Sequence, residues 1–218
     1  MNASFCVIAI DGGAGTGKST TANLLSQRLN LMHVDTGSHY RTVSKFLLDV
    51  KVEPDQVEEW LKLNSLTLDS TIESQKSFLS VNDKKFTHKE LRSDLVNGLV
   101  SQYAMNACVR KLLFSYQRNQ VQLARERAYN GLVMEGRDIG TIILPDADLK
   151  VFLHADQGVR ESRRAKDGEN DQISSRDKVD SQRKIAPLRE SRGSLRLDTS
   201  VLGVEEVYLV IQGAIRNK

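Results

Sequence analysis

The chain has 218 residues and carries 31 Lys and Arg against 28 Asp and Glu, which leaves a formal net charge of +3. A charge this small gives no support to nucleic-acid binding, and the chain lacks a basic segment with interleaved aromatic residues. No apolar run approaches the roughly 20 residues that cross a bilayer. We therefore expect a soluble globular protein with no nucleic-acid or membrane partner. We also expect a monomer, because no strong apolar stripe is left over.

Cysteine usage and the N-terminus indicate the compartment. Cys6 lies in an apolar segment, where a cysteine is more often a small buried hydrophobe than half of a disulfide, and Cys108 is the second of the two cysteines. The N-terminal residues lack a basic region, and their apolar run is too short for a signal peptide. We expect a cytoplasmic protein.

Residues 12–19 read GGAGTGKS and match the phosphate-loop pattern G-x-x-x-x-G-K-[ST] at every position. The apolar residues 5–10 before them predict a buried strand, and residues 20–29 predict a helix. Backbone N–H groups and the helix dipole converge on phosphate oxygens in such a loop. The expected ATP-binding residues are Gly12, Gly13, Ala14, Gly15, Thr16, Gly17, Lys18, Ser19 and Thr20. Lys18 adds a cation for the outer phosphates, and the Ser19 hydroxyl can face Mg²⁺ or its water shell.

The rest of the chain alternates between strand and helix patterns. Core strands are expected at residues 31–34, 132–134, 149–153 and 195–197, and helices at 40–50, 54–63, 89–129 with a break near Asn106, and 204–215. Residues 66–68 and 78–81 read as short strands, with a turn at 82–83, and indicate a small antiparallel insert. The alternation predicts an α/β fold of three layers, with a mostly parallel five-stranded core sheet and helices on both faces. Ligands of such sheets bind beyond the carboxyl ends of the strands.

Polar clusters follow two more of these strands. Residues 35–41 read DTGSHYR, and Arg41, one turn into a helix, is suited to grip a second phosphate. The alternative is that Asp35 and Thr36 only cap the helix and Arg41 is a solvated charge. Residues 135–141 read EGRDIGT, and charges packed between two glycines at a strand end favour a binding role over the alternative of a salt-bridged turn.

A third polar region runs over residues 160–192. It holds ten Lys and Arg and seven Asp and Glu with few large apolar residues, so we expect it to be mobile. Its arginines fall in two groups: Arg160, Arg163 and Arg164, then Arg176, Arg183 and Arg189. A mobile arginine-rich flap suits phosphoryl transfer, because it brings positive charge to the transferring group and excludes water. The alternative is a solvated, charged helix pair.

Taken together, these residues resemble the bacterial cytidylate kinases, of the nucleoside monophosphate kinase group, over nearly the whole chain. The markers are IAIDG leading into the phosphate loop, DTG with YR at 40–41, GRDIGT at 136–141 with PDA at 145–147, and APL at 186–188 with DTS at 198–200. The resemblance implies one P-loop kinase domain, residues 1–218. Its core would be about 1–37, 101–155 and 190–218, its monophosphate-binding lobe about 38–100, and its short arginine-rich lid about 156–189.

The resemblance also implies roles for single residues. Arg41, Arg137 and Arg183 would hold the phosphate of CMP; Ser101, Arg110 and Asp138 would read the cytosine; and Arg176 and Asp180 would contact the ribose. Thr36 completes the expected substrate-binding set. Arg160 and Arg164 are candidate lid cations. The catalytic set would be Lys18, Arg137, Arg164 and Arg183, and the metal residue Ser19. Cytosine presents an amine donor to a carboxylate where uracil presents a carbonyl, so Asp138 is suited to choose between them.

The implied reaction transfers the γ-phosphate of ATP to CMP or dCMP. Arginines from several segments would offset the repulsion between the two anionic nucleotides, and no dedicated general base is needed. The alternatives are another acceptor, such as UMP, and a nucleotide-binding regulatory protein.

Three features depart from the family pattern. Gly13 stands where the family usually has proline, Ser38 and His39 replace a small and an apolar residue, and eleven residues separate Arg164 from Arg176, which is a short lid. We expect His39 to point to solvent, the alternative being contact with the acceptor pocket. His33, His88 and His154 show no metal-ligand spacing and are expected to be structural or surface residues.

Overall fold

The computed structural model describes residues 4–166, 180–183 and 185–216. Arg176, a predicted ribose contact, lies outside the described residues. The division of the chain into core, lobe and lid stays a prediction. Within the described ranges, no helix is both long enough and apolar enough to span a membrane.

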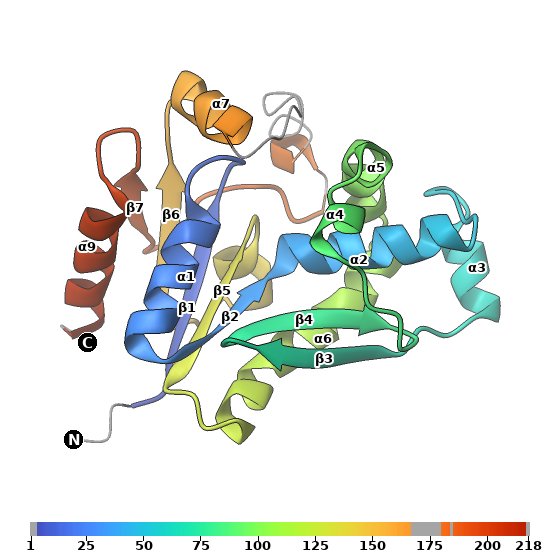
Figure 1. The fold of residues 1–218 in the computed structure, drawn as a ribbon, viewed down its shortest axis with the longest axis horizontal. Helices are drawn as coiled ribbons and strands as arrows, with labels where there is room; N and C mark the ends of the chain where they lie inside the picture. Colours follow the sequence, from blue (N-terminus) through green and yellow to red (C-terminus); the bar gives the residue numbers. More distant parts are fainter. Residues whose placement is uncertain (1–3, 167–179, 184, 217–218) are drawn as a thin grey trace.

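A single sheet of seven strands, in the order β3-β4-β2-β5-β1-β6-β7, forms the middle layer (Figure 1). The strands are β1 (Cys6–Gly12), β2 (Leu31–Asp35), β3 (Leu68–Glu73), β4 (Lys76–Val81), β5 (Gly131–Gly136), β6 (Leu149–His154) and β7 (Leu195–Asp198). β1 pairs in parallel with β5 and β6, and β2 and β7 extend the parallel ladder on either side. The five predicted core strands are therefore confirmed.

The predicted antiparallel insert is also present, but it is not a separate sheet. β3 and β4 pair antiparallel, and β4 then pairs in parallel with β2 through His33 opposite Lys76 and Val34 opposite Ser77. The backbone N–H of His33 donates to the carbonyl of Gln75 in the hairpin turn, at 2.8 Å. The hairpin thus extends the core sheet.

Helices cover both faces of the sheet. They are α1 (Lys18–Leu29), α2 (Thr36–Asp49), α3 (Val57–Leu63), α4 (His88–Leu91), α5 (Asp94–Met105), α6 (Ala107–Glu126), the π-helical turn η1 (Ile139–Ile143), α7 (Gln157–Lys166) and α9 (Val204–Arg216). The predicted break near Asn106 is confirmed, because the Asn106 side chain accepts from the Cys108 N–H at 2.9 Å and caps α6. α2 begins at Thr36, earlier than predicted, because Asp35 accepts from the Ser38 N–H at 3.1 Å.

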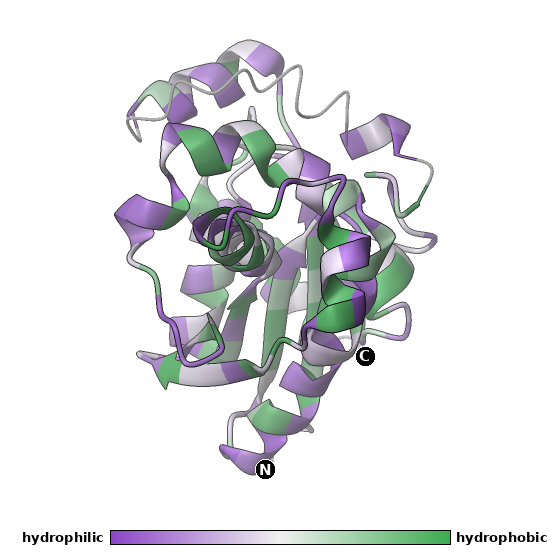
Figure 2. Ribbon diagram, turned by 90° about the vertical axis from the view of Figure 1, so that its right-hand side faces the viewer, coloured by the Kyte–Doolittle hydropathy of each residue, from purple (hydrophilic) through white to green (hydrophobic). Residues whose placement is uncertain are grey.

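Alternate residues of the central strands pack against different helices. Ile8, Ile10 and Val133 share a buried cluster with residues of α1 and α9. Their neighbours Ala9 and Leu132 face the other way, into a cluster with residues of α6 and η1. This period of two is that of a strand buried on both faces. Figure 2 shows the apolar central strands inside a shell of helices with polar outer faces.

His39 is the clearest error of the sequence interpretation. It is fully buried, so the expectation that it points to solvent is wrong, and it does not line the cleft described below. α2 turns this side chain toward α6, where its ring packs edge-on against Tyr116 with 5.1 Å between centroids. Neither ring nitrogen has a hydrogen-bond partner among the described residues. Burial lowers the pKa of His39 to about 4, against the smaller opposing effect of Asp35.

Substitution of His39 by Leu should therefore change the acid sensitivity of the fold. An unfolded histidine protonates below a pKa of about 6.5, whereas His39 in the folded state stays neutral down to about pH 4. Its contribution to stability is complete above pH 6.5 and is lost as the pH falls toward 4, an effect of about 3 kcal/mol. Urea unfolding at pH 7 and pH 4.5 measures it: the His39→Leu variant should gain stability relative to the parent at the lower pH. The opposing titration of Asp11 is common to both proteins and cancels. An equal difference at both pH values would contradict the prediction.

Candidate active site

A cleft of about 490 Å³ opens at the carboxyl ends of β1, β2 and β5. The phosphate loop and the start of α1 form one wall, and α2, α4 and α5 form the opposite wall. Arg164 of α7 and the segment with Asp180 and Arg183 complete it. The cleft therefore lies where ligands of parallel sheets are expected to bind, beyond the carboxyl ends of the strands.

Cationic side chains, one from the loop itself and three from outside it, hold the backbone of the phosphate loop. Consecutive carbonyls of Gly12, Gly13, Ala14 and Gly15 accept from Arg137 at 2.5 Å, Lys18 at 2.7 Å, Arg160 at 3.2 Å and Arg163 at 3.4 Å. Gly15 has a φ of +72°, and a Cβ there would lie 2.8 Å from the Arg160 carbonyl oxygen. Glycine is needed at that position because the backbone of α7 packs directly against the loop.

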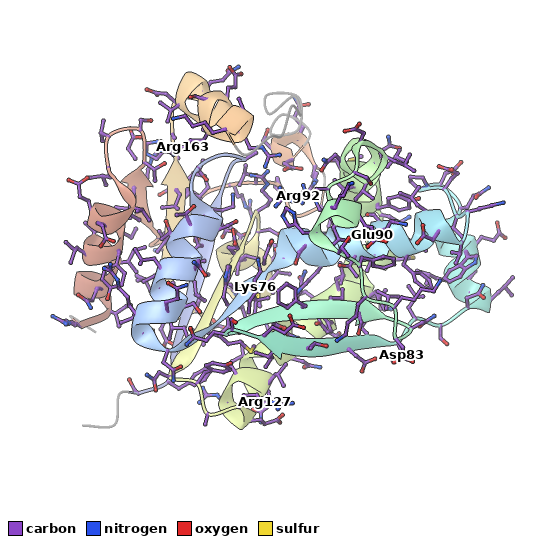
Figure 3. The ribbon with its side chains drawn as sticks, in the orientation of Figure 1. Lys76, Asp83, Glu90, Arg92, Arg127 and Arg163 are labelled. Carbon is purple, nitrogen blue, oxygen red and sulfur yellow. The ribbon has the colours of Figure 1, made fainter. Side chains whose placement is uncertain are left out.

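The three arginines of α7 have different positions. Arg160 and Arg163 bind carbonyls of the phosphate loop, and Arg163 also donates to the Thr199 carbonyl at 2.7 Å. Figure 3 shows Arg163 on the side of α7 that faces the loop. Arg164 lines the cleft itself. Of the two candidate lid cations, Arg164 therefore reaches the space in front of the loop and Arg160 supports the loop from behind.

Asp11, at the end of β1, ties the phosphate-loop strand to the GRD segment. Its two carboxylate oxygens accept from the N–H groups of Ile139 and Gly140, each at 2.7 Å. Burial raises the pKa of this carboxyl to about 6, and the two backbone hydrogen bonds oppose the rise. Asp11 thereby fixes the loop that carries Arg137 and Asp138.

The predicted phosphate-binding arginines meet on the far side of the cleft. Arg41, Arg137 and Arg183 all line it, and Arg41 is only 7% exposed, so the alternative of a solvated charge is wrong although Asp35 does cap the helix. The Asp180 carboxylate pairs with Arg137 at 2.9 Å and with Arg183. Burial lowers the pKa of Arg183, and Asp180 opposes that shift. Thr36 also lines the cleft and donates to the Glu135 carbonyl at 2.8 Å.

A buried ion pair between Arg110 and Asp138 lies at the end of the cleft near Ser101 and Tyr40. Asp138 and Ser101 line the cleft, whereas Arg110 lies behind Asp138. Burial raises the pKa of Asp138, and Arg110 opposes the rise. The Arg110 guanidinium lies 5.6 Å from the ring centroid of Tyr40, whose own pKa burial raises to about 12. Asp138 therefore presents a shielded carboxylate to the cleft.

The wall of the cleft formed by the phosphate loop carries a hydroxyl and a carboxylate side by side. The Ser19 hydroxyl donates to Oε2 of Glu135 at 2.8 Å, and both residues line the cleft. Oxygen ligands of this kind suit Mg²⁺, which keeps most of its waters and takes only one or two protein ligands beside substrate phosphates. The described residues contain no cluster of three His, Cys, Asp or Glu that would hold a metal alone.

Comparison with known proteins decides the family. The cytidylate kinase family model matches residues 8–217. The chain is 39% identical over 211 residues to a cytidylate kinase of Clostridium botulinum (strain Langeland), covering 92% of this chain and 93% of the relative. It is 38% identical to the cytidylate kinase of Thermosipho melanesiensis, with 98% of each chain covered. The chain belongs to the cytidylate kinase family. Among solved structures, a gluconokinase from Sinorhizobium meliloti shares the fold, with a TM-score of 0.50 at 12% identity over 100% of this chain and 94% of that one.

Several residues around the cleft were not predicted from the sequence. Tyr40, His88, Arg92 and Glu135 line it and were not predicted as site residues. Tyr40 and Glu135 lie inside strand-end segments that the sequence did single out, so position alone could have suggested them. His88 and Arg92 come from the short α4 and its end, and no pattern marks them. Gly12 and Gly13 do not line the cleft, and their carbonyls accept from Arg137 and Lys18. Thr16 lines a smaller hollow behind the loop.

Replacing Asp11 by Asn should loosen the GRD segment of this cytidylate kinase family member. The amide group of Asn would turn a donor toward one of the two backbone N–H groups, and a buried donor without an acceptor costs about 1–3 kcal/mol. Urea unfolding at pH 7 should show a loss of this size. Asp146→Asn is the matched control, since Asp146 is exposed in the same region, and its effect should stay within about 0.5 kcal/mol. Equal stability of the two variants would show that Asp11 does not hold the segment.

Proposed function

We propose that this protein catalyses transfer of the γ-phosphate of ATP to CMP or dCMP, giving ADP and CDP or dCDP. The supporting observation is the shared cleft: a phosphate loop on one wall and three arginines with a buried carboxylate on the other. A site for one triphosphate alone needs no second group of arginines. Two anionic nucleotides brought together need them, because their phosphates repel one another.

On the donor side, we propose that the phosphate loop and Lys18 hold the phosphates of ATP. Lys18 now donates to the Gly13 carbonyl, and an ATP phosphate would offer it an alternative, charged acceptor. A hollow of about 310 Å³ lined by Thr16, Arg163 and Thr199 adjoins the loop and offers space for the donor nucleoside. Arg164, in the cleft, would stabilise charge on the transferring phosphate.

Ser19 and Glu135 are the residues we propose for Mg²⁺, which would neutralise charge on the triphosphate when bound. Their contact at 2.8 Å leaves further lone pairs of the carboxylate available to accept hydrogen bonds. Ser19 and Glu135 line the cleft together with Lys18, where we propose that the outer phosphates of the donor bind.

On the acceptor side, we propose that Arg41, Arg137 and Arg183 hold the phosphate of CMP. In the structure, the Asp180 carboxylate pairs with Arg137 and Arg183. The phosphate of CMP would replace that carboxylate as the partner of the two arginines. With those arginines engaged by phosphate, the Asp180 carboxylate would be available to contact the ribose hydroxyls. Thr36 would add a hydroxyl contact, and Arg176 remains a prediction from the sequence.

The base end supports cytosine over uracil. The Asp138 carboxylate accepts hydrogen bonds and faces the cleft, and the exocyclic amine of cytosine donates one. Uracil would set a carbonyl against that carboxylate, a buried mismatch. Arg110 holds Asp138 in place and opposes the rise in its pKa that burial causes, and Ser101 offers a second polar contact.

The cellular setting completes the proposal. Neither Cys6 nor Cys108, both within the described residues, forms a disulfide, which suits a reducing cytoplasm. A monomer suffices, because segments of a single chain line the cleft.

Release of ADP in the presence of single nucleoside monophosphates tests the proposed reaction. CMP and dCMP should accelerate it, with kcat/KM at least about 100-fold above that for UMP, AMP or GMP. A preference for UMP, or tight ATP binding with no effect of any monophosphate, would overturn the assignment in favour of another acceptor or a regulatory protein.

The role of Asp138 is tested by its conversion to Asn, which preserves shape and can present either an amide oxygen or an amine. The preference for CMP over UMP should fall about tenfold or more. Asp138→Ala should reduce it too, but leaves the Arg110 charge buried without its partner, at a cost of about 3–5 kcal/mol in stability. Asp146→Asn should leave the preference unchanged. If Asp138→Asn also leaves it unchanged while the fold is intact, another group reads the base.

A further inference from the structure

Three polar side chains from three elements form a buried chain beside the phosphate loop. The Ser19 hydroxyl of α1 donates to Oε2 of Glu135, at the end of β5, at 2.8 Å. Nε2 of His33, on β2, lies 2.9 Å from Oε1 of the same carboxylate. The side chains of His33 and Glu135 are each only 3% exposed. Both oxygens of Glu135 therefore have a fixed partner.

The strand register places the three groups together. β2 and β5 run parallel with His33 opposite Val133, and Glu135 follows Val133 by one strand period, so His33 and Glu135 lie on the same sheet face. Val133 packs in the cluster that contains Ala22 and Leu25 of α1. This is therefore the face covered by α1, whose first turn carries Ser19.

The contact with Glu135 is the one hydrogen bond of the His33 ring within the part of the chain that the structure describes, because Nδ1 has no hydrogen-bond partner there. A carboxylate accepts, so the imidazole donates through Nε2–H. Burial makes this hydrogen bond directional and strong, and it restricts the rotation of the carboxylate about its last bond. Removal of the ring would leave Oε1 buried without this donor.

We propose that His33 is a positioning residue for the kinase reaction: it fixes Glu135, and through Glu135 the Ser19 hydroxyl, in the orientation that binds Mg²⁺ of the donor nucleotide. The inference rests on the proposed role of Ser19 and Glu135. Partners of this kind behind a metal-binding residue change metal affinity by about 10–100-fold when removed. A residue that only filled space in the core would change stability without changing the need for Mg²⁺.

Calorimetric titration of ATP into the acceptor-free protein, in EDTA and at a series of Mg²⁺ concentrations, tests the proposal. The His33→Leu variant should bind ATP as the parent does in EDTA. It should need about tenfold more Mg²⁺ for half of the Mg²⁺-dependent gain in affinity. His33→Gln, which can supply an N–H near the position of Nε2, should restore most of the loss.

His39→Leu is the matched control, because it removes another buried histidine that does not contact Glu135. It should leave the Mg²⁺ requirement unchanged. The His33→Leu effect should also disappear when Glu135 is already replaced by Gln, because coupled residues are not additive. Melting temperatures establish that each variant is folded.

Two outcomes would overturn the proposal. One is an equal loss of ATP affinity by His33→Leu with and without Mg²⁺, and the other is an undiminished effect in the Glu135→Gln background. A failure here is separable from a failure of the proposed function. If only the role of His33 is wrong, the parent protein would still phosphorylate CMP. If the proposed function is wrong, the Mg²⁺ shift of His33→Leu would remain and CMP would have no effect.

Discussion

The outward-facing carbonyl oxygens of the phosphate loop are the constraint on which the site depends. A loop that directs its N–H groups toward a phosphate leaves its carbonyls pointing away, and those oxygens need partners. Arg137, Lys18, Arg160 and Arg163 supply them in order along the loop. One comes from the acceptor side, one from the loop itself and two from α7. The shape of the donor site is therefore set by the segments that surround it.

On the opposite wall, where we propose that the acceptor binds, buried charges rather than backbone carbonyls need partners. Buried arginines are costly unless they are paired, and here carboxylates of the chain pair with them: Asp180 with Arg137 and Arg183, and Asp138 with Arg110. A phosphate offers the first pair an equivalent set of oxygens. Binding of an acceptor would thus exchange one set of ion pairs for another, which keeps the arginines ordered before substrate arrives and limits the net gain in affinity.

Local patterns made much of this predictable. The phosphate loop, the Asp35 cap and the break at Asn106 each depend on a few adjacent residues. The contact between His33 and Glu135 spans 102 residues and depends on strand register, which no local pattern encodes. His39 was misplaced because a polar residue on a helix was expected to face water, whereas the packing of α2 against α6 decides its orientation. The pairing of the hairpin with the core sheet could not be predicted either, because it also depends on the register between strands that are distant in the sequence.

That pairing has a mechanical consequence. β2 lies between β4 and β5, so the hairpin and the carboxylate beside the phosphate loop share one strand. His33 contacts both, with its backbone N–H on the Gln75 carbonyl and its ring on Glu135. Displacement of the hairpin would shear β2 against β5 across a ladder of hydrogen bonds and a close-packed core, which resist such sliding. The hairpin is thus joined through β2 to the strand that carries Glu135, and displacement of the hairpin would strain the contact between His33 and Glu135.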